Sequence, residues 1–441
     1  MAHIGTNPAE YRDTELEPLP ERWQLTPLNE MATLVSDKTE PSDARGMPYV
    51  GLEHIDSGNP RLMRVGNPEE VRSTKGVFCE QDVLYGKLRP YLDKAVLAPC
   101  SGICSTDILI LRAKAESCDP RFLAFALHCY PFLQHAINTT TGTNHPRTSW
   151  AKIGSFRFML PPLPEQQKIA AVLGAVQEAK ERTEAVIQAA KELKKSLLRY
   201  LFTYGPVPVD EAENVPLKET EVGDLREDWE VVDLADLVAE GPQNGIYKPQ
   251  SDYGQGSPIL RIDDYENEGG LVTGASRRVS LSEDEIEKYG LQPGDILVNR
   301  VNSLTHLGKT ALVGDLSEAV VFESNMMRFR VNGQKVTPEY IFRFLTSPMS
   351  RRQMREKAKR AVAQSSINQG DVKSLKVPCP PLSVQRLLTD ALDAADRRFA
   401  AELDTGLAFR AMFVALLRSL MTARIRVDEL PLEELDLKVP A

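Results

Sequence analysis

The sequence predicts an α+β protein with a pseudo-two-fold internal repeat, in which two globular domains are separated by two long antiparallel helices that form a coiled coil. The chain has 441 residues, more than one hydrophobic core usually holds, so at least two domains are expected. Segments recur in the same order when the sequence is shifted by roughly 206 to 219 residues. Each copy ends in a proline-rich stretch and a long run of apolar residues at helical spacing.

The repeat begins near the amino terminus and continues along most of the chain. Trp23 in "LPERWQLTPL" corresponds to Trp229 in "LREDWEVVDL". Further along, "GMPYVGLEHI" matches "GSPILRIDDY", "EQDVLYGKLRPYLDKAVLA" matches "PGDILVNRVNSLTHLGKTALV", and "DPRFLAFAL" matches "TPEYIFRFL". A period this long indicates a duplicated domain and excludes a solenoid of short repeats.

Each half is predicted to contain short strands first and helices afterwards. The predicted strands are rich in β-branched residues and cover 82–88, 107–113, 259–263, 295–301 and 326–331. The predicted helices cover 120–138 and 338–358, and each half closes with a strand, at 156–160 or 375–379. This order of elements is the basis of the α+β assignment.

A proline-rich junction follows the last strand of each half. It reads "LPPLPEQQKIAAVL" at 160–173 and "CPPLSVQRLLTDAL" at 379–392. Proline ends a strand because it has no amide proton for the ladder. Pro164, or Ser383 as a cap, suits the first turn of a helix. The junctions therefore predict a strand that stops and a helix that starts.

Two spacer helices are predicted at 165–202 and 383–422, on the basis of apolar residues at alternating spacings of four and three. Each could be a core helix of its own domain, but matched lengths favour mutual antiparallel pairing. The acidic, proline-rich linker at 203–224 could run back along the first helix. The predicted seam consists of Val172, Val176, Val186, Leu193, Leu197, Leu388, Leu392, Phe399, Phe409, Phe413, Leu416 and Leu420.

Composition excludes several classes of protein. No apolar run is long enough to cross a membrane, and the amino terminus lacks a signal-peptide pattern, so a cytoplasmic protein is expected. The six cysteines and the histidines have no metal-ligand spacing, so free thiols and no metal site are expected. Ser303 occupies the place of the first glycine of a phosphate-binding loop. We find no catalytic constellation.

The polar residues of two pairs of loops suit contact with DNA. The net charge of −9 lies mainly in the termini and the middle of the chain, and a nearly neutral domain can present a basic face. Arg, Asn and Gln can read base edges, while Lys and hydroxyl groups suit phosphates. Each loop taken alone could equally be a solvated surface loop. The candidates are Lys87, Arg89, Lys94, Asn144, His145, Arg147, Thr148, Ser149, Asn299, Arg300, Asn302, Lys309, Gln364, Ser365, Asn368 and Gln369, and the basic helix 351–360 is a candidate phosphate track.

On these residues the chain resembles the specificity subunit of type I restriction-modification enzymes. The resemblance covers essentially the whole chain and rests on "PPLPEQQKIA" and "PPLSVQRLLT", "YGKLRPYLDK", "GDILVNR", "GTNHPRTSW" and "SSINQGDVKSLKVPCPPL". It implies target-recognition domains at 1–164 and 225–382, a tail at 423–441, and an asymmetric bipartite DNA site. The second junction of the chain has Ser383-Val384 where the first has Pro164-Glu165, so it departs from the family pattern only in the capping residues.

The resemblance also implies partners. These are double-stranded DNA, two DNA-adenine methyltransferase subunits that carry S-adenosylmethionine, and restriction subunits that use ATP and magnesium. No cofactor is then expected on this chain, which would not be an enzyme. Ile169, Ile187 and Leu198 are candidates for contact with the methyltransferase. Two other hypotheses stay open: a pseudo-symmetric coiled-coil scaffold that binds only protein, and a stand-alone enzyme with an unrecognised site.

Overall fold

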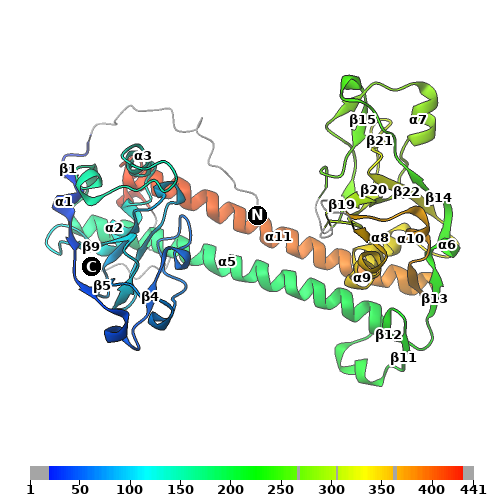
Figure 1. The fold of residues 1–441 in the computed structure, drawn as a ribbon, viewed down its shortest axis with the longest axis horizontal. Helices are drawn as coiled ribbons and strands as arrows, with labels where there is room; N and C mark the ends of the chain where they lie inside the picture. Colours follow the sequence, from blue (N-terminus) through cyan, green and yellow to red (C-terminus); the bar gives the residue numbers. More distant parts are fainter. Residues whose placement is uncertain (1–18, 266–268, 304–305, 361–364, 431–441) are drawn as a thin grey trace. The chain divides into compact units, whose positions relative to one another are not determined.

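The computed structural model describes residues 19–265, 269–303, 306–360 and 365–430. The chain divides into two compact units, one of residues 1–185 with 404–441 and the other of residues 186–403. We refer to them as unit 1 and unit 2. Two long helices, α5 (Leu163–Tyr204) and α11 (Leu382–Met421), are each divided between the units, with one part in unit 1 and the other in unit 2 (Figure 1). No helix of the described ranges is long and apolar enough to span a membrane.

Unit 1 contains two four-stranded sheets. The first has the order β2 (Ala32–Val35), β9 (Ile108–Ala113), β6 (Val83–Gly86) and β7 (Ala95–Leu97); the second has the order β3 (Lys38–Thr39), β5 (Lys75–Phe78), β8 (Gly102–Cys104) and β4 (Tyr49–Val50). A separate pair joins β1 (Gln24–Pro27) to β10 (Arg157–Leu160). The helices of this unit are α1 (Leu28–Met31), α2 (Pro120–Ala126), α3 (Tyr130–Asn138) and α4 (Trp150–Ile153), and α2 packs on β6, β7 and β9.

Unit 2 repeats this plan with additions. Its main sheet has the order β14 (Val238–Asn244), β22 (Met326–Val331), β18 (Ile296–Asn299), β20 (Thr310–Val313) and β16 (Gly270–Val272). Smaller sheets contain β17 (Arg278–Val279), β15 (Tyr253–Leu260) and β21 (Val321–Phe322); β19 (Val301–Asn302), β24 (Ser365–Ser366) and β23 (Lys359–Arg360); and β13 (Glu230–Asp233) with β25 (Lys376–Cys379). The short helices are α6 (Leu234–Leu237), α7 (Glu283–Tyr289), α8 (Pro338–Thr346), α9 (Pro348–Lys357) and α10 (Gln369–Lys373).

The central strands of both main sheets are buried on both faces. In β6, Val83 and Tyr85 belong to one apolar cluster and Leu84 to another. In β18, Ile296 and Val298 are separated from Leu297 in the same way. Because alternate side chains of a strand point to opposite faces, a strand between two apolar layers needs an unbroken apolar run. The runs "VLY" and "ILV" meet that need.

The structure corrects two predicted helices. The segment 120–138 forms α2 and α3, and the segment 338–358 forms α8 and α9. Each break falls just before a proline in the first turn of the second helix, Pro131 or Pro348. The ring of a proline clashes with the preceding turn and removes an amide donor, so neither segment continues as one helix. Both halves break at the same place.

A buried glutamine closes each proline-rich junction. Gln166 accepts a hydrogen bond from Asp119 N (2.9 Å) and donates to the carbonyl oxygens of Ser117 (2.9 Å) and Pro161 (2.8 Å). Gln385 makes the same set, from Thr337 N (3.0 Å) and to the carbonyls of Lys335 (3.1 Å) and Pro380 (2.8 Å). Each side chain is completely buried. The glutamine thus joins the start of the long helix to the loop before α2 or α8. Ser383, predicted as a cap, lies inside α11, whose first amides bond to the Pro381 carbonyl.

In each unit, a part of α5 packs against a part of α11 that runs in the opposite direction. In unit 1, Lys180 Nζ lies 5.0 Å from the centre of the Phe413 ring, and Glu184 pairs with Arg410 at 2.8 Å. In unit 2, Lys194 pairs with Asp396 at 2.5 Å. Val172, Leu388, Leu392, Phe413 and Leu420 are buried, and Val176, Leu197, Phe399, Phe409 and Leu416 are partly buried.

Two predicted seam residues require correction. Val186 is 46% exposed and Leu193 is 68% exposed. The less exposed face of this stretch includes Ala190, Lys194 and Leu197 instead. The Lys194 side chain is about two-thirds buried while its ammonium group pairs with Asp396, as is common for long cationic side chains. A pattern that counts only apolar residues passes over such a lysine and selects its neighbour.

The predicted linker 203–224 is more structured than an extended strap. It contains a short 3₁₀ helix (Val209–Asn214), and its end forms a hairpin of β11 (Leu217–Thr220) and β12 (Gly223–Arg226). Gly223 has a φ of +114°, a conformation that L side chains rarely adopt and glycine adopts readily. The prolines and acidic residues of this segment therefore mark turns within a folded connection.

Candidate nucleic-acid interface

The two predicted loops of unit 1 meet beside the carboxyl end of β6. Arg89 N donates to the Pro146 carbonyl at 2.7 Å, and Thr148 N donates to the Lys87 carbonyl at 3.0 Å. Leu88 and Arg147 form an isolated antiparallel bridge between these bonds. Backbone hydrogen bonds therefore bring together residues about 60 positions apart in the sequence, as a recognition surface requires.

The matching loops of unit 2 meet through the same hydrogen bonds. Ile367 N donates to the Arg300 carbonyl at 2.9 Å, and β19 pairs with β24 so that Val301 lies opposite Ser366. A third bond is also shared, from Lys87 N to the Asp107 carbonyl (2.9 Å) and from Arg300 N to the Asn325 carbonyl (2.8 Å). The repeat therefore extends to individual backbone contacts, whereas the side chains at these positions differ.

The loop 87–94 of unit 1 has an unusual backbone. Arg89 (φ 52°) and Asp93 (φ 48°) both occupy the left-handed region, on either side of a short 3₁₀ turn at Pro90–Leu92. This conformation is costly for residues with a Cβ atom, and such strain concentrates at functional sites. Arg89 is exposed, and within the described ranges its guanidinium has no hydrogen-bond or ion-pair partner. Tyr91 beside it is 52% exposed.

A buried histidine supports the base of this loop. His128 Nδ1 lies 2.8 Å from Asp93 Oδ1, and its Nε2 lies 2.9 Å from the Ala95 carbonyl. Both partners are acceptors, so the arrangement suits an imidazole ring that donates from both nitrogens. Burial lowers the pKa of His128, but Asp93 and the Ala95 carbonyl outweigh that effect and the pKa is raised. The pair anchors the second strained residue of the loop.

Arg147 is held by a partner that the sequence did not suggest. Its Nε donates to Asp107 Oδ1 at 2.9 Å and its Nη2 to Asp107 Oδ2 at 3.3 Å. The hydrogen bonds and charge of Asp107 raise the pKa of Arg147. Asp107 stands directly before β9, and sequence reasoning passed over it because an acidic residue is not expected at a DNA surface. Asp107 and Asn325 occupy equivalent positions of the repeat, and a polar residue at the same point in both halves could have indicated this site.

Several other candidates are turned inward. In unit 1, the Thr148 side chain is buried against Thr139 (3.1 Å between hydroxyl oxygens), and the half-buried Lys94 donates to the Leu52 carbonyl. Burial lowers the pKa of Lys94. Asn144 and His145 are exposed, and Ser149 is half-buried at the start of α4.

Unit 2 shows the same division. Asn299 is completely buried and accepts from the Tyr265 hydroxyl at 2.5 Å, while Lys309 donates to the Ile262 carbonyl at 2.8 Å. Ser365 is buried as well. Arg300 and Asn302 are half-buried, and Asn368 and Gln369 are exposed at the start of α10. Asn368 also caps α10 by accepting from Asp371 N. Gln364 lies outside the described residues.

The basic helix α9 presents part of its charge to solvent. Arg352 and Arg355 are exposed, and Arg352 pairs with Glu356 at 2.9 Å. Met354 on the opposite side is buried in the core. The helix is therefore amphipathic, and its predicted phosphate contacts belong to the exposed side.

Comparison with known proteins identifies the family. The model of the type I restriction modification DNA specificity domain matches twice, at residues 20–192 and 226–406. The chain belongs to this family. Among its relatives, the type I restriction enzyme MjaVIII specificity subunit of Methanocaldococcus jannaschii is 24% identical over 93% of this chain and 95% of its own length. The EcoKI specificity subunit of Escherichia coli strain K12 is 24% identical over 83% and 80%.

A solved structure shares the fold of this specificity protein. The type I restriction-modification system S subunit from M. genitalium has a TM-score of 0.56 at 12% identity, over 93% of this chain and 97% of that one. The family prediction made from the proline-rich junctions and the repeat is confirmed. So is the prediction that the chain is a specificity component and not an enzyme.

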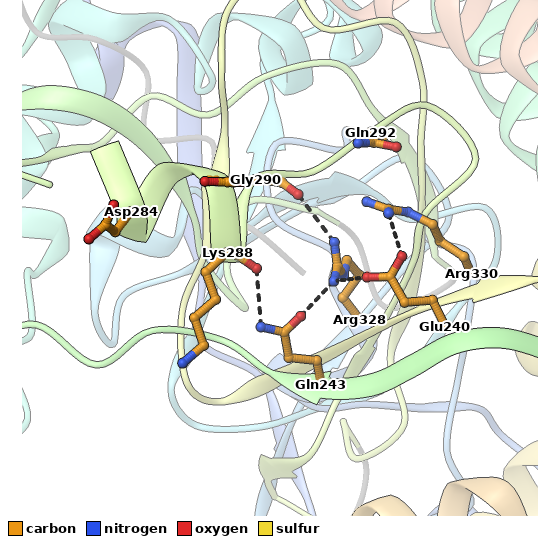
Figure 2. A pocket seen from close by; sticks show the side chains of 9 residues that line it. Glu240, Gln243, Asp284, Lys288, Gly290, Gln292, Arg328 and Arg330 are labelled. Carbon is orange, nitrogen blue, oxygen red and sulfur yellow. Dashed lines mark hydrogen bonds and ion pairs between the residues drawn. The ribbon is translucent and has the colours of Figure 1, made fainter. Parts of the chain in front are cut away.

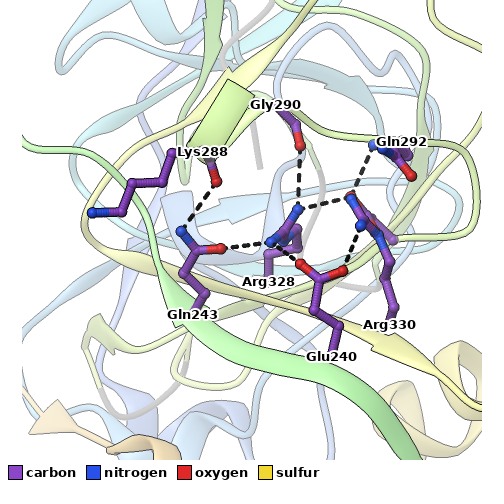
Figure 3. A network of polar contacts seen from close by, with 8 residues as sticks. Glu240, Gln243, Lys288, Gly290, Gln292, Arg328 and Arg330 are labelled. Atoms are coloured by element: carbon purple, nitrogen blue, oxygen red, sulfur yellow. Dashed lines mark hydrogen bonds and ion pairs between the residues drawn. The ribbon is translucent and has the colours of Figure 1, made fainter. Parts of the chain in front are cut away.

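The specificity domain of unit 2 also contains a polar pocket of ≈ 470 Å³ (Figure 2). It is lined by Glu240, Gln243, Asp284, Glu287, Lys288, Gly290, Gln292, Arg328 and Arg330. Figure 3 shows that Glu240, Arg328 and Arg330 are engaged with one another. Arg328 Nη2 donates to Glu240 (2.7 Å) and Gln243 (2.5 Å), and Arg330 Nη1 donates to Glu240 (2.6 Å).

One part of this network, the pair of a buried aspartate and an arginine, occurs in both units. Arg330 Nε donates to the completely buried Asp295 at 2.5 Å, and in unit 1 Arg112 Nε donates to the buried Asp82 at 2.7 Å. In both units the aspartate also accepts an amide three residues before it. A buried carboxylate needs such partners, and this one fixes the turn before the central strand. Among the described residues, no group of three or more His, Cys, Asp or Glu is placed to hold a metal ion.

Proposed function

We propose that this chain is the DNA-recognition subunit of a type I restriction-modification complex and that each unit reads one half of an asymmetric bipartite site. The observation that carries the proposal is the pair of joined loops, which has one set of backbone bonds in both units and different side chains on each. Lys87, Arg89 and Arg147 of unit 1 are replaced by Arg300, Asn302 and Ser366. One framework with two sets of side chains suits two different half-sites.

The candidate residues then divide into two roles. The exposed or half-exposed side chains are proposed to touch DNA: Lys87, Arg89, Asn144, His145, Arg147, Ser149, Arg300, Asn302, Asn368 and Gln369. The buried or tethered ones, Lys94, Thr148, Asn299, Lys309 and Ser365, are proposed to hold the loops. An accessible donor is needed for base readout, and a side chain that is buried, or whose one donor group already bonds inside the protein, does not supply one.

The long helices are proposed to act as a spacer between the two readers. A helix of 42 residues at 1.5 Å per residue is about 60 Å long. Half-sites one turn of DNA apart are about 34 Å apart, which recognition domains mounted near both ends of such a pair could span. The antiparallel packing of α5 and α11 within each unit supports this proposal.

Partner docking is proposed to use the apolar surface of these helices. Ile169, suggested by the sequence, is buried in the core of unit 1 and is withdrawn from this role. Ile187 and Leu198 are half-buried, while Leu403, Leu407 and Val414 are each 42% to 45% exposed on α11. Two DNA-adenine methyltransferase subunits would dock there, and S-adenosylmethionine, ATP and magnesium would be bound by the methyltransferase and restriction subunits in a cytoplasmic complex.

Footprinting of the reconstituted complex tests the proposal. The expected result is two short protected clusters of base pairs separated by an unprotected spacer, because the reading loops lie in two separate units. Arg147→Ala should remove protection in one cluster and leave the other. A protein-only scaffold would give no footprint, and a uniform footprint independent of sequence would contradict the proposal.

A further inference from the structure

We propose that Asp107 is a positioning residue that aims the Arg147 guanidinium at a guanine in the half-site of unit 1. The inference rests on the proposed function, because it assigns a base to one of the two readers. Asp107 is not one of the residues that the sequence pattern suggested. Its proposed role follows from which N–H donors of Arg147 it uses and which it leaves available.

The geometry leaves the outer end of the guanidinium available. Arginine has five N–H donors in a rigid planar fork. Asp107 accepts from Nε (2.9 Å) and Nη2 (3.3 Å), which is the side of the fork. Nη1 lies 3.5 Å from the His145 carbonyl, too far for a strong hydrogen bond. The two parallel N–H groups at the end of the fork can therefore donate to O6 and N7 of one guanine, the commonest specific contact of arginine.

Charge favours a base edge over a phosphate at this point. The carboxylate of Asp107 neutralises Arg147, so the pair as a whole attracts a phosphate weakly. A guanine edge is uncharged and needs only two donors in the right place. Arg89, which has no partner within the described ranges, is better suited to the phosphate backbone. We therefore assign Arg147 to base reading and Arg89 to contact with the phosphate backbone.

Both members of the pair are fixed by the fold. Arg147 exchanges backbone hydrogen bonds with Thr141, at 3.0 and 2.9 Å. Asp107 accepts from Lys87 N through its own carbonyl. The Arg147 side chain is 43% exposed and that of Asp107 27%. An ion pair this exposed contributes little to stability, so it can be removed without unfolding the domain.

The pair has no counterpart in unit 2. The equivalent positions are Asn325 and Ser366, which together lack any charge. The inference therefore assigns the guanine contact to one half-site only. That asymmetry makes the test selective.

The test measures methylation by the reconstituted complex on a library in which each position of the recognised site carries each base in turn. Arg147→Ala should abolish a preference for guanine at one position of one half-site, a loss of about tenfold or more. Asp107→Asn should weaken that preference several-fold, and Asp107→Glu should restore most of it. All other positions should be unaffected. Asp263→Asn, which removes the bidentate partner of the similarly exposed Arg277 in unit 2, is the matched control.

The outcomes separate this inference from the proposed function. If Asp107→Asn lowers methylation by one factor on every sequence, its role is structural and the inference is overturned. An unchanged base preference in both variants overturns it as well. A wild-type complex with no sequence preference at any position would instead overturn the proposed function itself.

Discussion

At the scale of single residues, the glutamine of the proline-rich junction explains why the motif occurs twice. Gln166 and Gln385 each make three backbone hydrogen bonds, one to their own junction and two to the loop before α2 or α8. The prolines end the strand and remove amide donors, which leaves the neighbouring carbonyl groups without local partners. A side chain with both donors and an acceptor is then required. Glutamine has both at one end.

Removing this side chain should be costly. Gln166→Ala leaves one buried amide and two carbonyl groups without partners, and we expect the free energy of unfolding of unit 1 to fall by ~2–4 kcal/mol. Denaturant unfolding, followed by hydrogen exchange in α2, measures the loss. Gln24→Ala, at an exposed position of β1 in the same unit, is the control and should change the free energy by less than about 0.5 kcal/mol. Equal effects of the two variants would contradict the assignment.

At the scale of elements, the long helices are attached to unit 2 by charge as well as by apolar packing. Arg343 on α8 pairs with Asp396 at 2.6 Å and also with Asp393, and Lys194 on α5 pairs with the same Asp396. Asp396, on α11, therefore links that helix to both α8 and α5. Although burial raises the pKa of Asp396, its hydrogen bond with Lys194 and the charge of Arg343 lower it overall.

This cluster predicts a specific dependence on pH. A carboxylate whose pKa is lowered by folding stabilises the folded state above its unfolded pKa of about 3.9, and that contribution is lost as the pH falls further. Asp396→Asn should therefore lower the free energy of unfolding at pH 6, and the difference from wild type should shrink below about pH 4. Unfolding curves between pH 6 and pH 3 measure this. The control is Asp390→Asn, at an exposed position of α11 in the same unit. A difference that stays constant with pH would show that the charge of Asp396 is not involved.

At the scale of the whole molecule, the proposed spacer predicts how the recognised sequence responds to a change in helix length. Four added residues lengthen a helix by about 6 Å, close to the rise of two base pairs at ~3.4 Å each. Four residues inserted into the middle of α5 should therefore lengthen the spacer of the site and leave both half-sites unchanged. Mapping methylated adenines in host DNA measures the new site. A matched insertion in both α5 and α11 is the control for damage to their pairing. A change in the bases of either half-site would contradict the spacer model.

The sequence determined the features that depend on repetition and on local chemistry. The sequence alone predicted the doubled order of elements, the strand ends at the prolines and the family. These follow from residues that recur at matching positions of the two halves, such as Gln166 and Gln385. The two helix breaks near Pro131 and Pro348 also follow from local sequence, because each has a proline. The apolar pattern continues across both prolines, however, and it predicted single helices. Here the covalent limits of proline outweigh hydrophobic periodicity.

Only the tertiary structure decided which polar and apolar side chains face solvent. Asn299, Lys309 and Thr148 resemble DNA-contacting residues in type, yet each bonds inside its own unit. Leu193 has the spacing of a buried residue, yet Lys194 takes its place because Asp396 stands opposite. Asp107 pairs with Arg147, 40 positions away. Burial and pairing depend on contacts between distant segments, and a local pattern of residue types does not contain those contacts.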